Sequence, residues 1–317
     1  MLTLKPCVSG AKIIETIRKN VRFETAKMID IFPSEEKDNL ILKIVEECDY
    51  LLAHIKEHLA ASIISPSLDI AIRETEFPKS FYSKALRIGV YPISANPIHW
   101  GHLLVALSAI AHYSLDKVVF IIAGDDPRKS YLAPCQWRHY LSDLILVKFS
   151  PLLAYSNIAR DHNFDGETNI FRFLSLNPFQ KIDAFYIGGT DHYYRLDPKK
   201  EDKDTIEKLE ENITRKAYGF NDIMHSISII FAKRKGGSDI PVNTSLNVGF
   251  IPSLAFDASS TMVREALGDF TKSESLGLLP YTVYEDILSS KEKLFTDSYK
   301  NNSLNFTSFL AVKRASR

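Results

Sequence analysis

The sequence is poor in cysteine and carries no excess of charge of either sign. The three cysteines, Cys7, Cys48 and Cys135, lie far apart and form no CxxC pair. This spacing argues against a disulfide framework or a zinc ribbon and favours a reducing compartment. Lys and Arg together number 39, and so do Asp and Glu. Such a balance is not typical of a dedicated nucleic-acid-binding protein, so any anion-binding site is expected to be local.

Long hydrophobic runs are lacking as well. The first residues, MLTLKPCVSGAKII, contain no uninterrupted apolar core of signal-peptide length. The longest apolar region, residues 39–64, is interrupted by charged residues such as Lys43 and Glu46 and is not expected to span a bilayer. With 45% hydrophobic and 25% charged residues, the chain has the composition of a soluble globular protein. We expect a cytoplasmic enzyme with no membrane and no nucleic-acid partner.

From Leu86 onward, short apolar runs alternate with stretches of helical periodicity. This alternation predicts an α/β fold, with a Rossmann-like doubly wound parallel sheet covered by helices on both faces, in a domain of residues 83–317. Ligands of such folds bind at the carboxyl ends of the strands. The predicted strands are 87–91, 117–123, 152–155, 184–188, 228–232 and 248–251, and the predicted helices are 101–113, 134–148, 168–177, 203–218 and 259–267.

Residues 1–82 have helical periodicity but no catalytic motif. Apolar residues from Ile41 to Leu59 recur at spacings of three and four, which predicts an amphipathic helix facing a core. Ser34 is expected to begin this helix, and the segment 77–84 is a candidate linker. This N-terminal helical region either packs on the domain that follows or pairs with a second subunit, which would make the protein a homo-oligomer.

The stretch LRIGVYPISANPIHWGH, residues 86–102, combines a strand with a helix opening. Pro92 and the later Asn96-Pro97 pair are expected to stop the strand, because proline removes a backbone donor. His99 and His102 then stand in the first turn of a predicted helix, beside backbone N–H groups that have no partner inside the helix. Such an opening attracts anions, so the two imidazoles suit a phosphate chain. Two other interpretations stay open: the histidines only cap the helix, or they bind zinc.

A second stretch far down the chain has a matching layout. Ser259, Ser260 and Thr261 lead into a predicted helix, and Arg264 follows one turn later. Hydroxyl groups at a helix start, together with an arginine, again form an arrangement that binds phosphate oxygens. The sequence therefore contains two candidate half-sites for one phosphate chain, and we expect them to meet in space.

Together, the two stretches resemble the (H/T)xGH and ISSTxxR-like motifs of the nucleotidyltransferase superfamily, and more narrowly those of the nicotinamide and nicotinate mononucleotide adenylyltransferases. The family pattern G-x-F-G-G-(S/T)-F-(D/N)-P-x-H-x-G-H aligns without a gap with residues 89–102. Pro92 and Ile93 replace two glycines of the pattern, and Ala95 replaces an aromatic residue. We expect the backbone there to be reshaped. The resemblance covers residues 86–290.

Three segments between the two motifs also resemble the family. Lys129, followed by Arg138, resembles the region in which a lysine grips the mononucleotide phosphate. Thr168 stands near a predicted helix start, either as the contact to the pyridine amide or carboxylate or as an ordinary cap. Gly189 and Asp191 resemble the G-x-D that follows a strand, where the glycine lets the backbone approach a ribose and the aspartate binds sugar hydroxyls or a metal.

The resemblance implies a nucleotidyltransferase that binds ATP and a pyridine mononucleotide. It would transfer AMP from ATP to nicotinamide or nicotinate mononucleotide, forming NAD or its deamido form and pyrophosphate. Mg2+ bound with ATP is the expected cofactor, with no metal site built from protein side chains. The implied catalytic residues are His99, His102 and Arg264; those implied to bind ATP are Gly189, Asp191, Ser259, Ser260 and Thr261; those implied to bind the mononucleotide are Ser94, Lys129 and Thr168.

The aromatic residue that would stack on the pyridine ring is not evident. Relatives use a tryptophan near the threonine or after the G-x-D, but Trp100 and Trp137 lie elsewhere. Phe149, Tyr193 and Tyr194 are the candidates to replace it. Two alternative functions stay open: adenylyl or cytidylyl transfer to another phosphate acceptor such as phosphopantetheine, and a nucleotide-binding module without turnover.

Overall fold

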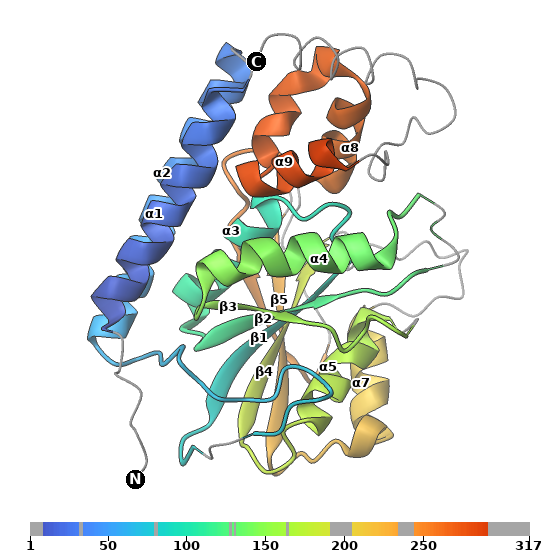
Figure 1. The fold of residues 1–317 in the computed structure, drawn as a ribbon. Helices are drawn as coiled ribbons and strands as arrows, with labels where there is room; N and C mark the ends of the chain where they lie inside the picture. Colours follow the sequence, from blue (N-terminus) through green and yellow to red (C-terminus); the bar gives the residue numbers. More distant parts are fainter. Residues whose placement is uncertain are drawn as a thin grey trace.

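The computed structural model describes residues 9–31, 34–78, 82–126, 129, 131–162, 165–190, 205–233 and 244–290. These residues form a six-stranded sheet with helices on both faces (Figure 1). The α/β class and the doubly wound arrangement that the sequence predicts are confirmed.

The strands of the sheet run parallel, in the order β3-β2-β1-β4-β5-β6. Each of the six predicted strands is present at its expected place. The chain reverses its direction of winding between β1 and β4, and ligands of such sheets bind in the crevice outside the carboxyl ends at this point. The strands are β1 Leu86–Ile93, β2 Lys117–Ile122, β3 Leu153–Ser156, β4 Ile182–Gly189, β5 His225–Ala232 and β6 Asn247–Ile251.

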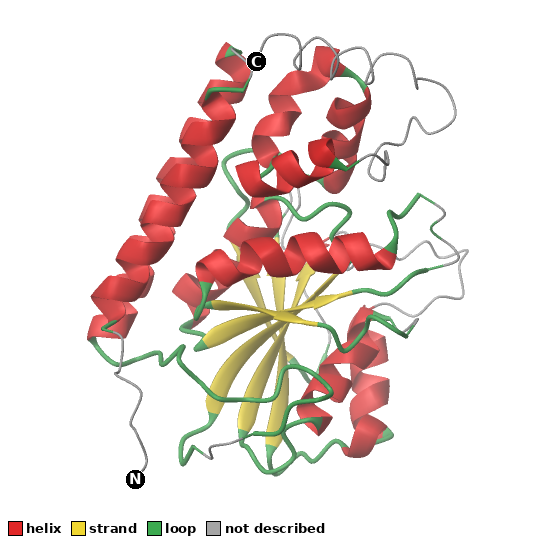
Figure 2. Cartoon of the chain, in the orientation of Figure 1, coloured by secondary structure: helices red, strands yellow, loops and turns green. Residues whose placement is uncertain are grey.

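Two layers of helices bury the two faces of the sheet. Helices α5 and α7 pack on the face that contains Ile88 and Val90 of β1, whereas α3 and α4 pack on the face that contains Tyr91. Helices α8 and α9 belong to the same buried core as α3 and α4. Figure 2 shows the twisted sheet between these helices. The helices are α1 Gly10–Ile29, α2 Glu35–Ala60, α3 Trp100–Tyr113, α4 Cys135–Leu146, α5 Gly166–Ser175, α7 Thr205–Thr214, α8 Ser260–Gly268 and α9 Tyr281–Ser289, with 3-10 turns η1 Val147–Phe149, η2 Ala217–Gly219 and η3 Phe270–Leu278. None of the helices in the described part of the chain has the length and apolar character needed to cross a membrane.

Helices α1 and α2 form an N-terminal hairpin that runs beside the rest of the chain (Figure 1). Helix α2 contacts α3 and η3, and α1 contacts α9 and η1. Ile17 of α1 and Leu52 of α2 belong to the same buried core as one face of the sheet. The Ser34 hydroxyl accepts the N–H of Lys37, so Ser34 begins α2 as predicted. The hairpin therefore packs on the following domain, and a homo-oligomer stays a prediction.

The expectation of helical structure up to residue 82 is wrong. Helix α2 ends at Ala60, and the described residues between it and β1 form turns and extended segments. The side chain of Asn177 accepts the N–H of Ala71 at 2.9 Å and donates to its carbonyl at 2.8 Å. Gln180 likewise accepts the N–H of Tyr82 at 2.8 Å. These contacts supply the backbone partners that a helix would otherwise provide.

Pro92 does not stop β1, contrary to expectation. β1 pairs with β2 through Ile93 but with β4 only through Val90. The Ile93 carbonyl accepts the N–H of Ala123 on the β2 side, so the nitrogen of the preceding Pro92 faces the β4 side. Since the β4 ladder has already ended there, the missing N–H of Pro92 interrupts no strand pairing.

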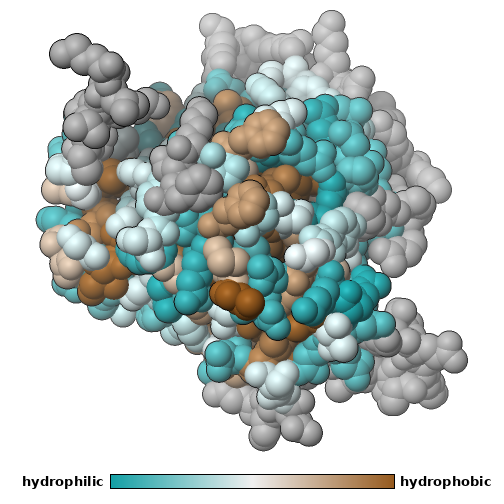
Figure 3. Space-filling view, turned by 90° about the horizontal axis from the view of Figure 1, so that it is seen from below, coloured by the Kyte–Doolittle hydropathy of each residue, from teal (hydrophilic) through white to brown (hydrophobic). Residues whose placement is uncertain are grey.

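The amino ends of the strands form the end of the sheet opposite both sequence motifs. Phe179 and Ile223, in the loops before β4 and β5, are 75% and 80% exposed, and Phe77, before β1, is 81% exposed. Figure 3 views the molecule from below and shows apolar areas between hydrophilic ones. None of the predicted site residues belongs to these loops.

Candidate active site

His99 and His102 open α3, just beyond the carboxyl end of β1. His99 is the N-cap residue and is 3% exposed. Its Nδ1 accepts the N–H of Gly101 at 3.1 Å, and Nδ1 of His102 accepts the N–H of His99 at 3.3 Å. The centroids of the two rings lie 3.9 Å apart. The two histidines do cap the helix, as one interpretation of the sequence holds.

These two hydrogen bonds decide which ring atom carries the proton. A neutral imidazole whose Nδ1 accepts a hydrogen bond carries its proton on Nε2. Capping therefore uses Nδ1, whereas donation to a phosphate oxygen would use Nε2. The two interpretations of His99 and His102 are compatible because they use different nitrogen atoms.

The opening of α8 lies against the loop that leads into α3. The Ser259 hydroxyl caps α8 by accepting the N–H of Met262 at 3.2 Å. Ser260 Oγ donates to the Pro97 carbonyl at 3.1 Å, a contact between residues 163 positions apart. Arg264 Nη1 donates to the Asn96 carbonyl at 2.9 Å, across 168 positions. The two helix openings that the sequence pairs do meet in space.

Arg264 is held inside this junction. The residue is 6% exposed, and its Nη2 donates to Thr261 Oγ1 at 3.1 Å, in addition to the bond from Nη1. The guanidinium carbon lies 5.2 Å from the centroid of the Tyr131 ring. The guanidinium places a positive charge at the α8 opening.

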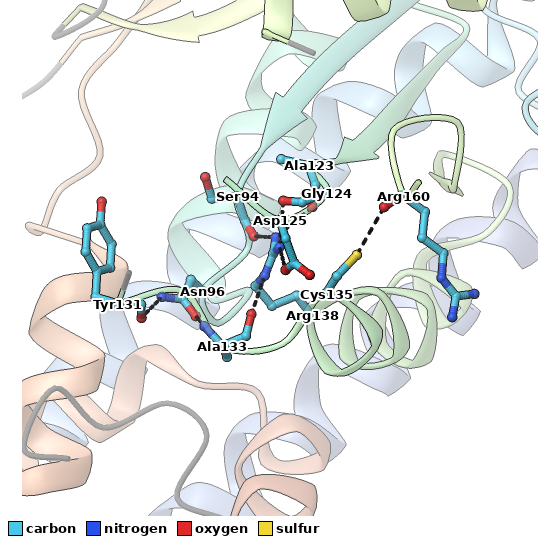
Figure 4. Close-up of polar contacts among 10 residues, drawn as sticks. All are labelled: Ser94, Asn96, Ala123, Gly124, Asp125, Tyr131, Ala133, Cys135, Arg138 and Arg160. Carbon is cyan, nitrogen blue, oxygen red and sulfur yellow. Dashed lines mark hydrogen bonds and ion pairs between the residues drawn. The ribbon is translucent and has the colours of Figure 1, made fainter. Parts of the chain in front are cut away.

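Asn96 connects the two openings to the loop after β2. The side chain is 2% exposed. Its Oδ1 accepts the N–H of Ala133 at 2.9 Å, and its Nδ2 donates to the Tyr131 carbonyl at 3.2 Å (Figure 4). With its own carbonyl bonded to Arg264, Asn96 joins the loop before α3 to two other segments of the site, the loop after β2 and α8. In the sequence Asn96 is the (D/N) position of the family pattern, before Pro97, but the partners of its side chain cannot be deduced there.

Arg138 is a second buried connector. It is 0% exposed, and Figure 4 shows its guanidinium directed into the junction between the ends of β1 and β2. Burial lowers the pKa of this group, but an arginine stays charged at neutral pH. It donates to the carbonyls of Ser94, Ala123, Gly124 and Ala133 and to Asp125 Oδ1, at distances from 2.7 to 3.3 Å. The arginine that the resemblance placed on α4 thus organises the backbone around the site.

The remaining predicted residues that the structure describes lie at the same end of the sheet. Ser94 follows β1, and its carbonyl is held by Arg138. Lys129 lies in the loop after β2, where its N–H donates to the Asp126 carbonyl at 2.9 Å. Gly189 ends β4 opposite Ala232. Asp191 lies outside the described residues.

Thr168 is not the cap of α5. Asp165 is the N-cap, and its Oδ1 accepts the N–H of Thr168 at 2.9 Å. Asp165 takes this position because its carboxylate reaches the N–H of the third helical residue. A Cβ placed on Gly166 would lie 3.2 Å from the Cβ of Pro92, so the opening of α5 abuts the end of β1. The helix start therefore borders the predicted site, and the capping interpretation of Thr168 is wrong.

Tyr186 of β4 also reaches the opening of α5. Its hydroxyl would lie 2.7 Å from a Cβ on Gly166. Burial, followed by the nearby carboxylate of Glu167, raises the pKa of Tyr186 far above its ordinary value. Glu167 is 6% exposed and accepts the Thr205 hydroxyl at 2.6 Å. A buried carboxylate with hydrogen-bond donors thus ties α5 to β4 and α7.

Burial excludes one of the three residues that could stack on the pyridine ring. Phe149 is 0% exposed and contacts the equally buried Trp100, with ring centroids 6.2 Å apart. A side chain enclosed in the core cannot stack on a ligand, so the suggestion of Phe149 is wrong. Tyr193 and Tyr194 lie outside the described residues.

Among the described residues, there is no group of three or more His, Cys, Asp and Glu side chains that could hold a metal ion. The zinc interpretation of His99 and His102 therefore finds no third ligand in that part of the chain. The donors that the site does offer are imidazole, hydroxyl, guanidinium and helix-opening N–H groups. Such donors bind the oxygens of an anion, and their placement on two joined helix openings suits a chain of phosphates.

Comparison with known proteins gives relatives among the nicotinate-nucleotide adenylyltransferases. No family model matches the chain. A probable nicotinate-nucleotide adenylyltransferase of Thermus thermophilus is 32% identical over 108 residues, which cover 34% of this chain and 58% of that protein. The chain thus matches less than two thirds of the length of this relative. A probable nicotinate-nucleotide adenylyltransferase of Clostridium perfringens is 28% identical over 195 residues, 58% of this chain and 87% of that protein.

Among solved structures, the nicotinic acid mononucleotide adenylyltransferase of Plasmodium falciparum in complex with NaAD is similar at a TM-score of 0.46 and 14% identity. The similarity covers 64% of this chain and 95% of that one.

Proposed function

We propose that this chain, a sequence relative of the nicotinate-nucleotide adenylyltransferases, transfers AMP from ATP to nicotinate or nicotinamide mononucleotide. The products would be deamido-NAD or NAD, together with pyrophosphate. One observation carries the proposal: the α3 opening with its two histidines and the α8 opening with Arg264 are joined through residues 96 and 97. Two phosphate-binding openings at the carboxyl end of a parallel sheet suit a nucleoside triphosphate.

The reaction needs no protein nucleophile. An oxygen of the mononucleotide 5'-phosphate attacks the α-phosphorus of ATP in line, and the bond between the α-phosphorus and the bridging oxygen to the β-phosphate breaks, so pyrophosphate leaves. The protein positions two mutually repelling anions and stabilises the charge that grows on the phosphoryl and leaving oxygens. In this proposal the Nε2–H groups of His99 and His102 and the guanidinium of Arg264 bind the ATP phosphates. The N–H groups and hydroxyls of residues 259–261 complete that half of the site.

The acceptor would bind on the β2 side of the same crevice. We assign Ser94 and Lys129 to its phosphate and Thr168, at the opening of α5, to the pyridine substituent. Gly189 would allow the backbone at the end of β4 to approach a ribose. Both mononucleotides are acceptors in this proposal.

Mg2+ is part of the proposal as a companion of ATP. Magnesium keeps several waters and is commonly held by substrate phosphates with only one or two carboxylates. It would supply charge neutralisation on the phosphates, and we assign no step to it. A cytoplasmic location completes the proposal.

The proposal is tested by incubating the full chain with ATP, Mg2+ and a panel of acceptors: nicotinate mononucleotide, nicotinamide mononucleotide and phosphopantetheine. We expect pyrophosphate release that depends on a pyridine mononucleotide, with the dinucleotide detected by mass spectrometry. Release that depends only on phosphopantetheine would replace the acceptor. ATP binding without release for any acceptor would favour the module without turnover.

The site assignment predicts the effect of two substitutions in this assay. His102→Ala and Arg264→Ala each remove a preorganised donor, which typically costs about 3 to 4 kcal/mol of transition-state stabilisation, or roughly several hundredfold in rate. His112→Ala, at the other end of α3, and Arg22→Ala, on the exposed side of α1, are the matched controls and should keep wild-type turnover. Wild-type turnover in His102→Ala or Arg264→Ala would refute the assignment.

A further inference from the structure

Tyr131 is an aromatic residue beside the candidate ATP site that belongs to neither motif. It lies in the loop between β2 and α4, two positions after Lys129, and is 53% exposed. The guanidinium carbon of Arg264 lies 5.2 Å from the centroid of its ring. This distance is within the range of a cation–π contact, in which the ring face attracts the positive charge.

The ring constrains Arg264 in a way that the hydrogen bonds do not. Asn96 and Thr261 accept from the two terminal nitrogens of the guanidinium, and such bonds lie near its plane. The contact with the ring face adds an attraction that neither hydrogen bond supplies. Arg264 is 6% exposed whereas Tyr131 is half exposed, so the pair lies where the buried junction reaches the surface.

The position of Tyr131 is itself fixed by the site. Asn96 Nδ2 donates to the Tyr131 carbonyl at 3.2 Å, as Figure 4 shows. The carbonyl of the same Asn96 accepts from Arg264. One buried residue thus holds both partners of the cation–π pair, so their contact follows from a built junction.

We infer that Tyr131 is a positioning residue for the proposed reaction: its ring holds the guanidinium of Arg264 in the orientation that binds the ATP phosphates. This inference rests on the proposed function, because it assigns Arg264 to ATP. Because the role of Tyr131 concerns ATP binding as well as turnover, the affinity for ATP tests this role independently of the adenylyl transfer reaction.

The test compares Tyr131→Leu with Tyr131→Phe. Leucine keeps an apolar side chain but has no ring face, and we expect its dissociation constant for ATP, measured by calorimetry, to rise about tenfold. Phenylalanine keeps the ring, so Tyr131→Phe should bind ATP within twofold of wild type. The KM for the mononucleotide should change little in either variant. Wild-type affinity in Tyr131→Leu, or an equal loss in Tyr131→Phe, would overturn the inference.

A second set of variants separates positioning from a general structural effect. In the Arg264→Ala background, Tyr131→Leu should cause no further loss of ATP affinity, because the charge that the ring positions is gone. The same tenfold loss in that background would contradict a role through Arg264. Tyr140→Leu, on α4, is the matched control and should bind ATP like wild type. If wild type binds ATP but transfers nothing to any acceptor, the proposed function fails while this cycle of affinities still decides the role of Tyr131.

Discussion

At the scale of single residues, the polar groups of the site are held by hydrogen bonds within the protein. His99 and His102 accept backbone N–H groups, and Arg264 donates to a carbonyl and a hydroxyl. A donor fixed in place needs little reorganisation when charge develops on a substrate. Each histidine can therefore cap the helix through Nδ1 and contact a ligand through Nε2. The capping hydrogen bond fixes the ring in the orientation that the ligand contact would need.

A titration prediction also belongs to this scale. His139 of α4 is 2% exposed, and its Nδ1 lies 2.6 Å from the Tyr155 hydroxyl. Burial first, and then the charge of Arg138, lowers the pKa of His139 to about 4. In the unfolded chain His139 becomes protonated near pH 6.5, whereas in the folded chain it becomes protonated only near pH 4. The contribution of the neutral histidine to the free energy of unfolding is therefore fully present above pH 6.5. We expect the free energy of unfolding to fall by about 3 kcal/mol as the pH decreases from 6.5 to 4.

Urea unfolding between pH 4 and pH 7 checks this expectation. His139→Asn keeps a polar group near Tyr155 but cannot titrate, so its free energy of unfolding should fall less steeply with decreasing pH than that of wild type. His54→Gln, on the exposed side of α2, should keep the wild-type slope. Parallel curves for wild type and His139→Asn would show that this histidine does not control acid stability.

At the scale of helices and loops, the α3 and α8 openings meet because no side chain stands between them. A Cβ on Gly101 would lie 2.6 Å from the Cβ of Ala258 and 2.9 Å from Cε1 of His99. Contacts of that length do not occur, so only glycine allows this approach. The glycine of the HxGH pattern thus brings the second motif close to the first.

We expect Gly101→Ala to destabilise the protein, although glycine to alanine inside a helix usually stabilises by about 1 kcal/mol. The added methyl group must move the segment before α8 or the ring of His99, so adenylyl transfer should fall at least as far as stability. Thermal unfolding and the transfer assay measure the two effects. Adding Ala258→Gly should restore part of the stability, since one of the two clashes is removed. A raised melting temperature in Gly101→Ala would contradict the close approach.

At the scale of the whole molecule, the N-terminal hairpin and the sheet share one core. Polar contacts reinforce the apolar ones at a point where α1 and α9 meet η1. Glu24 of α1 is 1% exposed and forms an ion pair with Lys148. It also accepts the N–H and the hydroxyl of Thr282, in the first turn of α9, at 2.8 and 2.6 Å. A buried carboxylate at a helix start with a cation beside it is a stable arrangement.

Glu24→Ala should therefore destabilise the entire chain. Removing one member of a buried ion pair leaves the other without compensation, and we expect the free energy of unfolding to fall by about 3 kcal/mol. Unfolding followed by circular dichroism and by the fluorescence of the two tryptophans should stay coincident in wild type, because hairpin and sheet unfold together. Glu15→Ala, on the exposed side of α1, serves as the control and should change stability little. A hairpin that melts before the tryptophan signal changes would argue for a separate unit.

The sequence alone predicts much of the fold and the two helix openings that meet in the structure, since both depend on local patterns. Apolar runs predict the six strands. Ser34 and Ser259 indicate the starts of the helices that they cap. It fails where a distant segment supplies the missing partner. Asn177 holds the backbone near residue 71 that helical periodicity alone would misplace. Asp165 takes the N-cap position of α5 that one interpretation of the sequence assigned to Thr168. Which of two neighbouring residues caps a helix depends on the backbone geometry at the start of that helix.

What the sequence by itself determined is the set of local structures: strand, loop and helix opening around residues 86–102, and the hydroxyl-rich opening before Arg264. Their chemistry follows from residue types and short spacings, which neighbouring backbone atoms are enough to express. The tertiary structure decided that the two openings contact each other and that Asn96 and Arg138 connect them to the loop after β2 by hydrogen bonds. It also decided that the ring of Tyr131 contacts the guanidinium of Arg264. Those contacts join segments brought together by the order of strands in the sheet, and that order is fixed by packing of the whole chain.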